Sequence, residues 1–381
     1  MSVVLTGGCA LSGAGVGTEA LLGALLAGRR LAETVPGLDP TEHLGKTGLR
    51  HFDRTALLLC SAARLALDGA GLPAGQTRYA PEEQGVVVGS THGSIQAIAE
   101  FDQEAVREGP KYVNPQAFAN TVINAPAGRV SILFGLTGLN STLSTGRASA
   151  LDALDYAARM LRAGRIGAVV WGSALGASPE IARGYGAAGV LVERERATPP
   201  FAAEPRGSAL AEGAAAFVLE DGERARGRGA PIHAAVTASS TDFDPRSGEA
   251  AQRRTVEAVL ERAGVAPAEL ACAFAGAVGR AAVDRVQGDV LAALLPGVPV
   301  TAVAGATGDC LEATPALALA AAAGVLAGGA VPPIAGLAPE EARADLDLVL
   351  GSPRPTAGRH VLVTACDESG HAAAVLVSAV P

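Results

Sequence analysis

Short apolar runs that alternate with longer Ala- and Leu-rich stretches limit the fold of this chain more than any other feature. Glycines bound these runs, and their β-branched residues are typical of buried strands. The runs are 3–6, 86–89, 168–172, 214–220, 232–237, 300–303, 361–364 and 373–377. The stretches 54–68, 149–162 and 314–326 have the length and composition of helices. Strands that alternate with helices predict an α/β protein whose mixed or parallel sheet is covered on both faces.

The stretch 314–326 carries signals for both of its ends. Thr314 is of a residue type that caps helix N-termini, and Pro315 suits the first helical position. Gly328 and Gly329 follow the stretch, and glycine readily adopts the left-handed backbone that ends a helix. We therefore predict a helix that is capped by Thr314.

The charge and the N-terminus exclude several classes of partner. The 381 residues carry a net charge of -8 and no long basic run, so there is no electrostatic footprint for nucleic acid or an anionic membrane. The N-terminus lacks the basic start and the apolar stretch of a signal peptide, and no uninterrupted apolar run of about 18 residues follows. We expect a cytoplasmic protein without a nucleic-acid or membrane partner.

The cysteines and histidines show no pattern of metal ligands. Five cysteines are scattered along the chain without C-x-x-C spacing, which argues against a disulfide framework and against a zinc site. None of the six histidines pairs with another histidine or a cysteine at metal-ligand spacing. We therefore expect no metal and no other cofactor.

A polar stretch rich in Gly and Arg, residues 221–229, is the best internal boundary. A new apolar run begins just after it, at about Ile232, as expected for a linker between two folded units. We therefore divide the chain into an N-terminal half, residues 1–230, and a C-terminal half, residues 231–381.

The order of several stretches resembles the ketosynthase branch of the thiolase superfamily over almost the whole chain. These stretches are 3–7 with 24–29, 85–90, 114–138, 208–220 with its Glu212-Gly213-Ala214, and more loosely 331–334 and 369–371. The resemblance implies a thiolase fold, with two pseudo-symmetric halves in αβαβα layers. The two halves of that fold would correspond to the proposed domains.

The resemblance also shows which catalytic positions have changed. In the family, a T-A-C-x-S loop places a nucleophilic cysteine at the N-terminus of a buried helix, where the helix dipole lowers the thiol pKa. The matching stretch here is Thr145-Gly146-Arg147-Ala148-Ser149, with Arg147 at the position of the nucleophile. A guanidinium is permanently protonated and cannot carry an acyl group. The chain therefore has no catalytic residue at this position.

The other members of the family's catalytic set are missing as well. Gly276 stands where the family has the histidine of an H-G-T motif, Ala304 replaces its lysine, and Asp309 its second histidine. The glycine-rich N-S-F-G-F-G-G turn is matched only by 364–370, which contains Cys366. These positions together form a predicted vestigial active site. A buried arginine is unfavourable unless it is paired, so we interpret Arg147 as a structural plug in this site.

Loss of the nucleophile on an intact scaffold resembles the chain length factors of bacterial type II polyketide synthases, which act in antibiotic biosynthesis. The resemblance implies a catalytically inactive subunit of a β-ketoacyl synthase complex. Such a subunit forms a heterodimer with an active ketosynthase, receives chains from an acyl carrier protein, and helps to shape the tunnel that sets polyketide chain length. Arg147 departs from the glutamine usual in these proteins, and the short chain fits the subgroup that works on polyenes.

Five residues are candidates for the tunnel or the subunit interface. They are Gln116, Phe118, Asn120, Thr121 and Trp171. The first four precede the Arg147 loop in the segment that reaches the tunnel in the resembled family. Trp171 belongs to an apolar run that we expect near the dimer contact. Bulky side chains there could limit chain length, as pocket walls discriminate between methylene groups, and ordinary core packing is the alternative role for each of them.

Two other functions remain open from the sequence. In the first, the chain is a thiolase-like acyltransferase in which Cys366 and the nearby His371 supply an activated thiolate. In the second, it is a homodimeric acyl-binding or regulatory protein that works without a ketosynthase. A buried, inert thiol is the usual state of a cysteine such as Cys366.

Overall fold

The computed structural model describes residues 2–76 and 78–380. Its strands are β1 (Val3–Ser12), β2 (Gly15–Val16), β3 (Gln84–Gly89), β4 (Asn140–Leu143), β5 (Ala168–Leu175), β6 (Gly213–Asp221), β7 (Ala234–Phe243), β8 (Leu270–Phe274), β9 (Val300–Thr301), β10 (Ala330–Val331), β11 (Arg354–Pro355), β12 (His360–Cys366) and β13 (His371–Ser378). Its α-helices are α1 (Thr18–Leu26), α2 (Pro40–Leu44), α3 (Arg54–Gly69), α4 (Ile95–Glu108), α5 (Ala125–Phe134), α6 (Ser149–Arg162), α7 (Pro179–Ala187), α8 (Gly222–Gly227), α9 (Gly248–Ala263), α10 (Ala281–Leu294), α11 (Ala304–Thr307) and α12 (Thr314–Gly328).

One mixed sheet of 11 strands runs through the molecule in the order β4-β3-β5-β6-β1-β7-β13-β12-β8-β9, with β2 attached to β1. The outer pairs β3–β4, β3–β5, β8–β9 and β12–β8 are parallel, and the inner pairs are antiparallel. Strands before residue 230 form one side of the sheet, and those after it form the other, joined where β1 pairs with β7. The sheet is continuous across this boundary. The division into two domains at 230/231 therefore stays a prediction.

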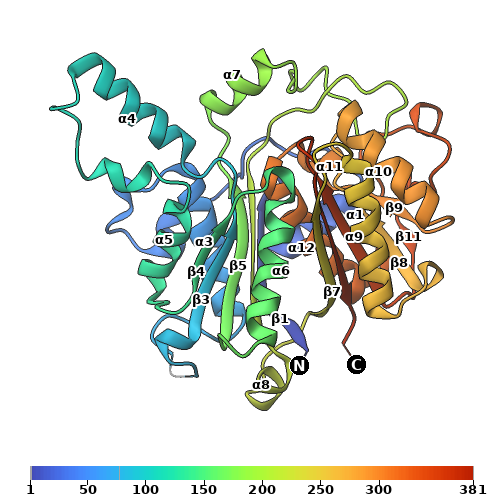
Figure 1. Cartoon of the computed structure of the whole chain (residues 1–381), viewed down its shortest axis with the longest axis horizontal. Helices are drawn as coiled ribbons and strands as arrows, with labels where there is room; N and C mark the ends of the chain where they lie inside the picture. The colour runs from blue at the N-terminus through green and yellow to red at the C-terminus, as the bar shows by residue number, and fades with distance from the viewer. Residues whose placement is uncertain (1, 77, 381) are drawn as a thin grey trace.

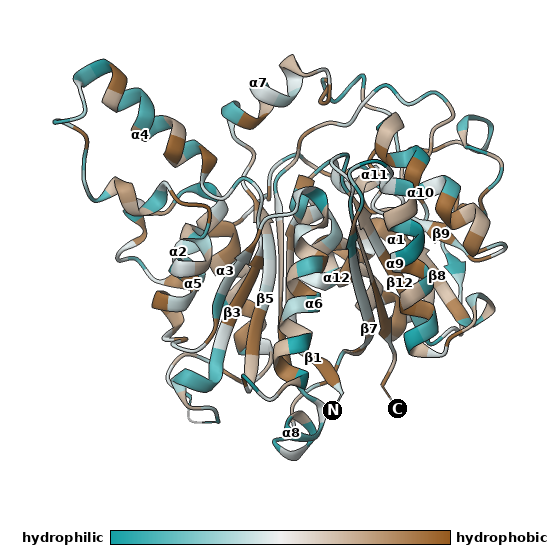
Figure 2. Cartoon of the chain, viewed as in Figure 1, coloured by the Kyte–Doolittle hydropathy of each residue, from teal (hydrophilic) through white to brown (hydrophobic). Residues whose placement is uncertain are grey.

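Helices cover both faces of this sheet in layers (Figure 1). Helices α3 and α5 cover the outer face of the N-terminal side, and α9 and α10 cover that of the C-terminal side. Between the two sides lie α6 and α12, which contact strands of both. The arrangement confirms the predicted α/β layering. Figure 2 shows the apolar strands enclosed by helices whose polar residues face outward.

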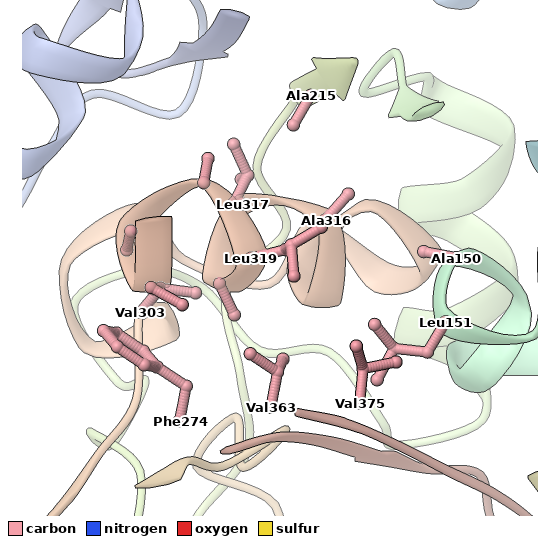
Figure 3. Close-up of a cluster of buried hydrophobic side chains, with 14 of the residues drawn as sticks. Ala150, Leu151, Ala215, Phe274, Val303, Ala316, Leu317, Leu319, Val363 and Val375 are labelled. Atoms are coloured by element: carbon pink, nitrogen blue, oxygen red, sulfur yellow. The ribbon is translucent and has the colours of Figure 1, made fainter. Parts of the chain in front are cut away.

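Helix α12 is buried on almost every side, as expected for a helix that is apolar all round. In Figure 3 its Ala316, Leu317 and Leu319 pack between Ala215 of β6 and the valines of β12 and β13. The window Leu311–Gly328 is long and apolar enough to cross a membrane, but 78% of it is buried inside the protein. Such burial is typical of the core helix of a soluble protein.

The predicted cap of α12 is wrong. Thr314 is the first helical residue, and its hydroxyl accepts a hydrogen bond from the N–H of Cys310 at 3.0 Å. A 3₁₀ turn, Leu311–Ala313, runs directly into the helix, so the helical backbone begins before Thr314. The other end agrees with the prediction, since Gly329 closes the helix in the left-handed region with a φ of 68°.

Close backbone approach places the start of α6 beside the end of β3. A Cβ atom on Gly89, the last residue of β3, would lie 2.3 Å from the carbonyl oxygen of Ser149. Only glycine fits there, because real Cβ atoms do not approach backbone so closely. The N-terminus of α6 therefore lies at the carboxyl end of the parallel strands, where α/β proteins bind ligands.

Candidate functional site

Arg147 lies in the 3₁₀ turn Gly146–Ala148, directly before α6. Its side chain is buried and forms a bidentate ion pair with Asp309, with Nη1–Oδ1 and Nη2–Oδ2 distances of 2.8 and 2.6 Å. The Arg147 backbone N–H donates to Oδ2 of Asp367 at 3.0 Å. Gly146 adopts a φ of 62°, and a Cβ there would meet that same carboxylate. The turn is therefore fixed from both sides.

Asp309 follows α11 and is completely enclosed. It also accepts hydrogen bonds from the Ser208 hydroxyl at 2.7 Å and from the N–H of Leu311 at 2.9 Å. Burial raises the pKa of Asp309, but the charge and hydrogen bonds of Arg147 outweigh it and lower the pKa overall. Asp309 in turn raises the pKa of Arg147 against the opposing effect of burial. Both groups stay charged, and neither is free to act on a substrate.

The remaining predicted vestigial positions, Gly276, Ala304 and Cys366, lie around this ion pair. Gly276 follows β8, and a Cβ on it would lie 3.0 Å from Cα of Ala365, the neighbour of Cys366. Ala304 and Cys366 belong to one small apolar cluster. Ala304 and Asp309 also border a hollow of about 30 Å³, which has room for water but not for an acyl chain. The structure thus brings the five predicted residues together.

Cys366 and His371 do not form a nucleophilic pair in this structure. Burial raises the pKa of the Cys366 thiol to about 12, and a hydrogen bond with Gln287 lowers it only in part. The ring of His371 instead stacks on Phe243, with ring centroids 4.3 Å apart. A thiol with so high a pKa holds almost no thiolate near neutral pH. The geometry therefore gives no support to the acyltransferase alternative.

The tunnel and interface candidates lie in different environments. Gln116 and Phe118 are exposed, and the Thr121 hydroxyl donates to the carbonyl oxygen of Phe118 at 2.9 Å. Asn120 is buried, and its Oδ1 accepts from Nη2 of Arg129 at 2.6 Å. The structure places Trp171 in the core instead of at a surface: its strand β5 is paired on both sides, and its indole donates to Ala150. A central strand has no free edge for a partner.

Large apolar side chains are exposed on one segment of the chain. Among the described residues, those with the greatest exposure between positions 106 and 132 are Val106, Tyr112, Phe118, Val122, Ile123 and Ile132. We call these residues the 106–132 apolar surface. Ile132 and Val106 are 79% and 85% exposed, although α5, which carries Ile132, packs its other face on α3. Helix α5 also contacts β4, the strand at the edge of the sheet. Exposed apolar side chains mark interaction sites where they form a contiguous patch.

A second polar group lies beside the vestigial site and escaped the sequence analysis. His92 follows β3, and its Nδ1 lies 2.8 Å from Oε2 of Glu312, which is fully buried. Its Nε2 lies 3.0 Å from the hydroxyl of Tyr185 in α7. The position of His92 just after a parallel strand was a usable signal. Glu312 and Tyr185 carried no such signal in the sequence, because only the fold brings them close to His92.

The described residues contain no group of three or more His, Cys, Asp or Glu side chains that could hold a metal ion. Together, the layered sheet and the ion pair at the start of α6 define the class of this protein: a layered α/β scaffold whose predicted nucleophile position holds a buried, paired arginine. Its family follows from comparison with known proteins. Residues 39–225 match the model of the beta-ketoacyl synthase N-terminal domain.

Relatives match over the whole length of the chain. The granaticin polyketide putative beta-ketoacyl synthase 2 of Streptomyces violaceoruber is 30% identical over 98% of this chain and 95% of that protein. The tetracenomycin polyketide synthase ketoacyl synthase beta subunit of Streptomyces glaucescens is also 30% identical, over 98% of both. The chain therefore belongs to the beta-ketoacyl synthase family, and it is similar over nearly its whole length to a polyketide putative beta-ketoacyl synthase 2 and to a polyketide synthase ketoacyl synthase beta subunit.

Solved structures show the same fold. A beta-ketoacyl synthase from Burkholderia phymatum superposes with a TM-score of 0.92 over 100% of both chains, at 23% identity. The ishigamide ketosynthase/chain length factor superposes with a TM-score of 0.89 over 100% of this chain and 99% of that chain, also at 23% identity. These superpositions confirm the thiolase fold that the sequence predicted.

Proposed function

We propose that this chain is a non-catalytic chain length factor. It pairs with an active ketosynthase, forms part of the acyl-chain tunnel, and sets the length of a polyketide. The observation that carries the proposal is the Arg147–Asp309 ion pair, because it fills the predicted nucleophile and histidine positions with two groups that satisfy each other. Condensation needs an activated nucleophile, so the acyl chain must be held covalently by a partner.

The names of the relatives support this assignment. The tetracenomycin relative is a ketoacyl synthase beta subunit. One structural neighbour is a ketosynthase/chain length factor, and another is a type II polyketide synthase acyl-carrier protein in complex with its ketosynthase. By analogy, the partners of this chain are a cysteine-bearing ketosynthase and an acyl carrier protein. A cytoplasmic location is part of the same proposal.

The 106–132 apolar surface is the proposed contact with the ketosynthase. Exposed Ile132 and Phe118 supply apolar area next to β4, whose outer edge has no neighbouring strand in the described chain. Obligate interfaces are large and apolar, which fits such a surface. Gln116, Phe118 and Thr121 are the proposed tunnel residues, and Asn120 positions them through its hydrogen bond with Arg129.

Intact-protein mass spectrometry tests the proposal. The purified chain is incubated with an acyl thioester, first alone and then with a cysteine-bearing ketosynthase from the same organism. We expect the acyl group on the ketosynthase only, and a one-to-one complex in native spectra. An acyl adduct on this chain that disappears in Cys366→Ala would establish a rearranged thiolase-like enzyme instead. A stable homodimer that does not bind the ketosynthase would favour an acyl-binding or regulatory protein.

A further inference from the structure

Helix α4 belongs to an arm that leaves the body of the protein and returns to the same place. We call residues 93–123 the α4 arm; they hold α4 and the 3₁₀ turn Ala117–Asn120, and Figure 1 shows α4 extending away from the sheet. Every residue of α4 is at least partly exposed. The rings of Phe101 and Phe118 have centroids 6.1 Å apart and join the helix to the turn. All residues of the 106–132 apolar surface except Ile132 lie on this arm.

The two ends of the α4 arm touch each other. Gly93 has a left-handed φ of 53°, and a Cβ atom there would lie 2.9 Å from Cα of Ile123 and 3.0 Å from its carbonyl oxygen. Only glycine accepts both this backbone conformation and so close a neighbour. The orientation of the whole arm therefore depends on how the loop just before Gly93 is held.

A single carboxylate holds that loop. Oε1 of Glu312, which is fully buried, accepts from the N–H groups of Thr91 and His92, each at 3.0 Å. Its Oε2 lies 2.8 Å from Nδ1 of His92. Hydrogen bonds to a charged acceptor are stronger than neutral ones, and a buried N–H without a partner is unfavourable. Glu312 therefore ties both the backbone and a side chain of the loop to the core.

The backbone of Glu312 is fixed in turn by the sheet and by the predicted vestigial site. Its carbonyl oxygen accepts from the hydroxyl of Ser173 on β5 at 3.0 Å. Leu311, directly before it, has a φ of 46°, which is strained for leucine, and its N–H donates to Asp309. Such a conformation persists only where the surrounding contacts enforce it. The turn that brings Asp309 to Arg147 thus also sets the position of Glu312.

We propose that Glu312 is a positioning residue for the contact with the ketosynthase. It holds the entry of the α4 arm and so orients the exposed Tyr112 and Phe118 toward the partner subunit. Glu312 is only 1% exposed, so it acts through the loop at 91–93 and not by contact with the partner. The identity of the partner rests on the proposed function, whereas the hold on the arm does not.

Hydrogen–deuterium exchange of the isolated full chain tests the hold on the arm. Glu312→Met keeps the length of the side chain and removes both acceptor oxygens, whereas Glu312→Gln keeps one acceptor for the two N–H groups. We expect the amides of residues 91–123 to exchange at least about tenfold faster in Glu312→Met. In Glu312→Gln they should exchange at close to the native rate.

Glu220→Met is the matched control for a general loss of stability. Glu220 is likewise a fully buried carboxylate, in an ion pair with Arg228. It pairs with Ala168 at the start of β5, whereas Glu312 lies beside Ser173 toward the end of that strand. We expect both methionine variants to unfold at a lower urea concentration than the native chain, and only Glu312→Met to speed exchange in the α4 arm.

Gly93→Ala tests the position of the arm independently, because the added Cβ would push against Ile123. Gly264→Ala is its control, since Gly264 has a similar φ of 63° and a Cβ there meets nothing within 4 Å. Analytical ultracentrifugation with the ketosynthase measures the consequence. We expect the complex to weaken at least about fivefold in Gly93→Ala and in Glu312→Met. Gly264→Ala, Glu312→Gln and Glu220→Met should bind like the native chain.

Three results would overturn the inference: native exchange of the α4 arm in Glu312→Met, equally fast exchange of the arm in Glu220→Met, or undiminished binding of the ketosynthase by Glu312→Met. The two experiments also separate this inference from the proposed function. A native chain that binds no ketosynthase rejects the proposed function and, with it, the contact with that partner. Faster exchange in Glu312→Met would still confirm that Glu312 holds the arm, because that experiment uses the isolated chain.

Discussion

The guanidinium of Arg147 and the carboxylate of Asp309 face each other in a bidentate ion pair within the core, with N–O distances of 2.8 and 2.6 Å. The two residues are 162 positions apart in the sequence. The sequence predicts that they stand where a ketosynthase has its nucleophile and a histidine. A buried ion pair contributes little net stability, but removal of one partner leaves the other charge buried and unpaired.

Asp309→Ala should therefore lower the free energy of unfolding by about 3–5 kcal/mol, because it leaves Arg147 unpaired in the core. Urea unfolding measures the change. Asp68→Ala, which breaks the exposed pair with Arg64, is the control and should change the free energy by less than about 1 kcal/mol. Arg147→Met/Asp309→Leu should recover most of the loss. Equal effects of Asp309→Ala and Asp68→Ala would contradict this reading.

A cysteine at position 147, in place of Arg147, should not restore acyl transfer. In Arg147→Cys, the nearby Asp309 carboxylate opposes formation of the thiolate, and Gly276 and Ala304 supply no acid or base. We expect no acyl adduct on Arg147→Cys after incubation with an acyl thioester, as judged by intact mass. Rapid acylation at position 147 would show that the helix N-terminus alone is sufficient for activation.

The native chain should resist thiol reagents. All five cysteines are buried, and burial raises the pKa of Cys9, Cys60 and Cys366 to about 12 and that of Cys272 and Cys310 still further. Iodoacetamide at pH 8 should add nothing to the folded protein within minutes and five groups to the protein in urea. Fast labelling of Cys366 in the folded state would revive the acyltransferase alternative.

The His92–Glu312 pair should make stability depend on pH. The pKa of His92 is raised from 6.5 in the folded state, so its contribution is complete below pH 6.5 and falls as the pH rises through the folded value. The pKa of Glu312 is lowered from 4.5, so its contribution is present above pH 4.5 and falls at lower pH.

His92→Gln should therefore be less stable than the native chain by about 2 kcal/mol between pH 4.5 and 6.5. The difference should shrink toward pH 9. Urea unfolding at pH 5.5 and pH 9 measures it, and an equal difference at both values would rule out the charged pair.

Ile132→Asp should weaken the complex with the ketosynthase at least tenfold, because it replaces an apolar side chain on the proposed contact by a charge. Analytical ultracentrifugation of the mixed subunits gives the dissociation constant. Phe243→Asp is the control: Phe243 is 48% exposed but lies outside the 106–132 apolar surface. Equal weakening by both variants would place the contact elsewhere.

Local patterns determined eight of the strands and three of the helices. The apolar runs lie within or across β1, β3, β5, β6, β7, β9, β12 and β13, and the stretch 149–162 matches α6. Val303 falls outside β9 and Ile232 precedes β7. The ends of a strand depend on where its neighbouring strands pair with it, and not on where the apolar run begins or ends. Strand β4 went unrecognised, because Asn140, Ser141 and Thr142 have no apolar pattern; the strand forms by pairing with β3 and packs against α5 and α6.

The sequence by itself determined that two catalytic motifs of the resembled family are missing, because no T-A-C-x-S loop and no H-G-T motif occur anywhere in the chain. Only the tertiary structure decided that Arg147 meets Asp309, that Trp171 is enclosed, and that His92, Glu312 and Tyr185 form one row. Residue types and short spacings act locally, whereas these contacts join different elements of the fold. They exist only once the chain has folded around α6 and α12.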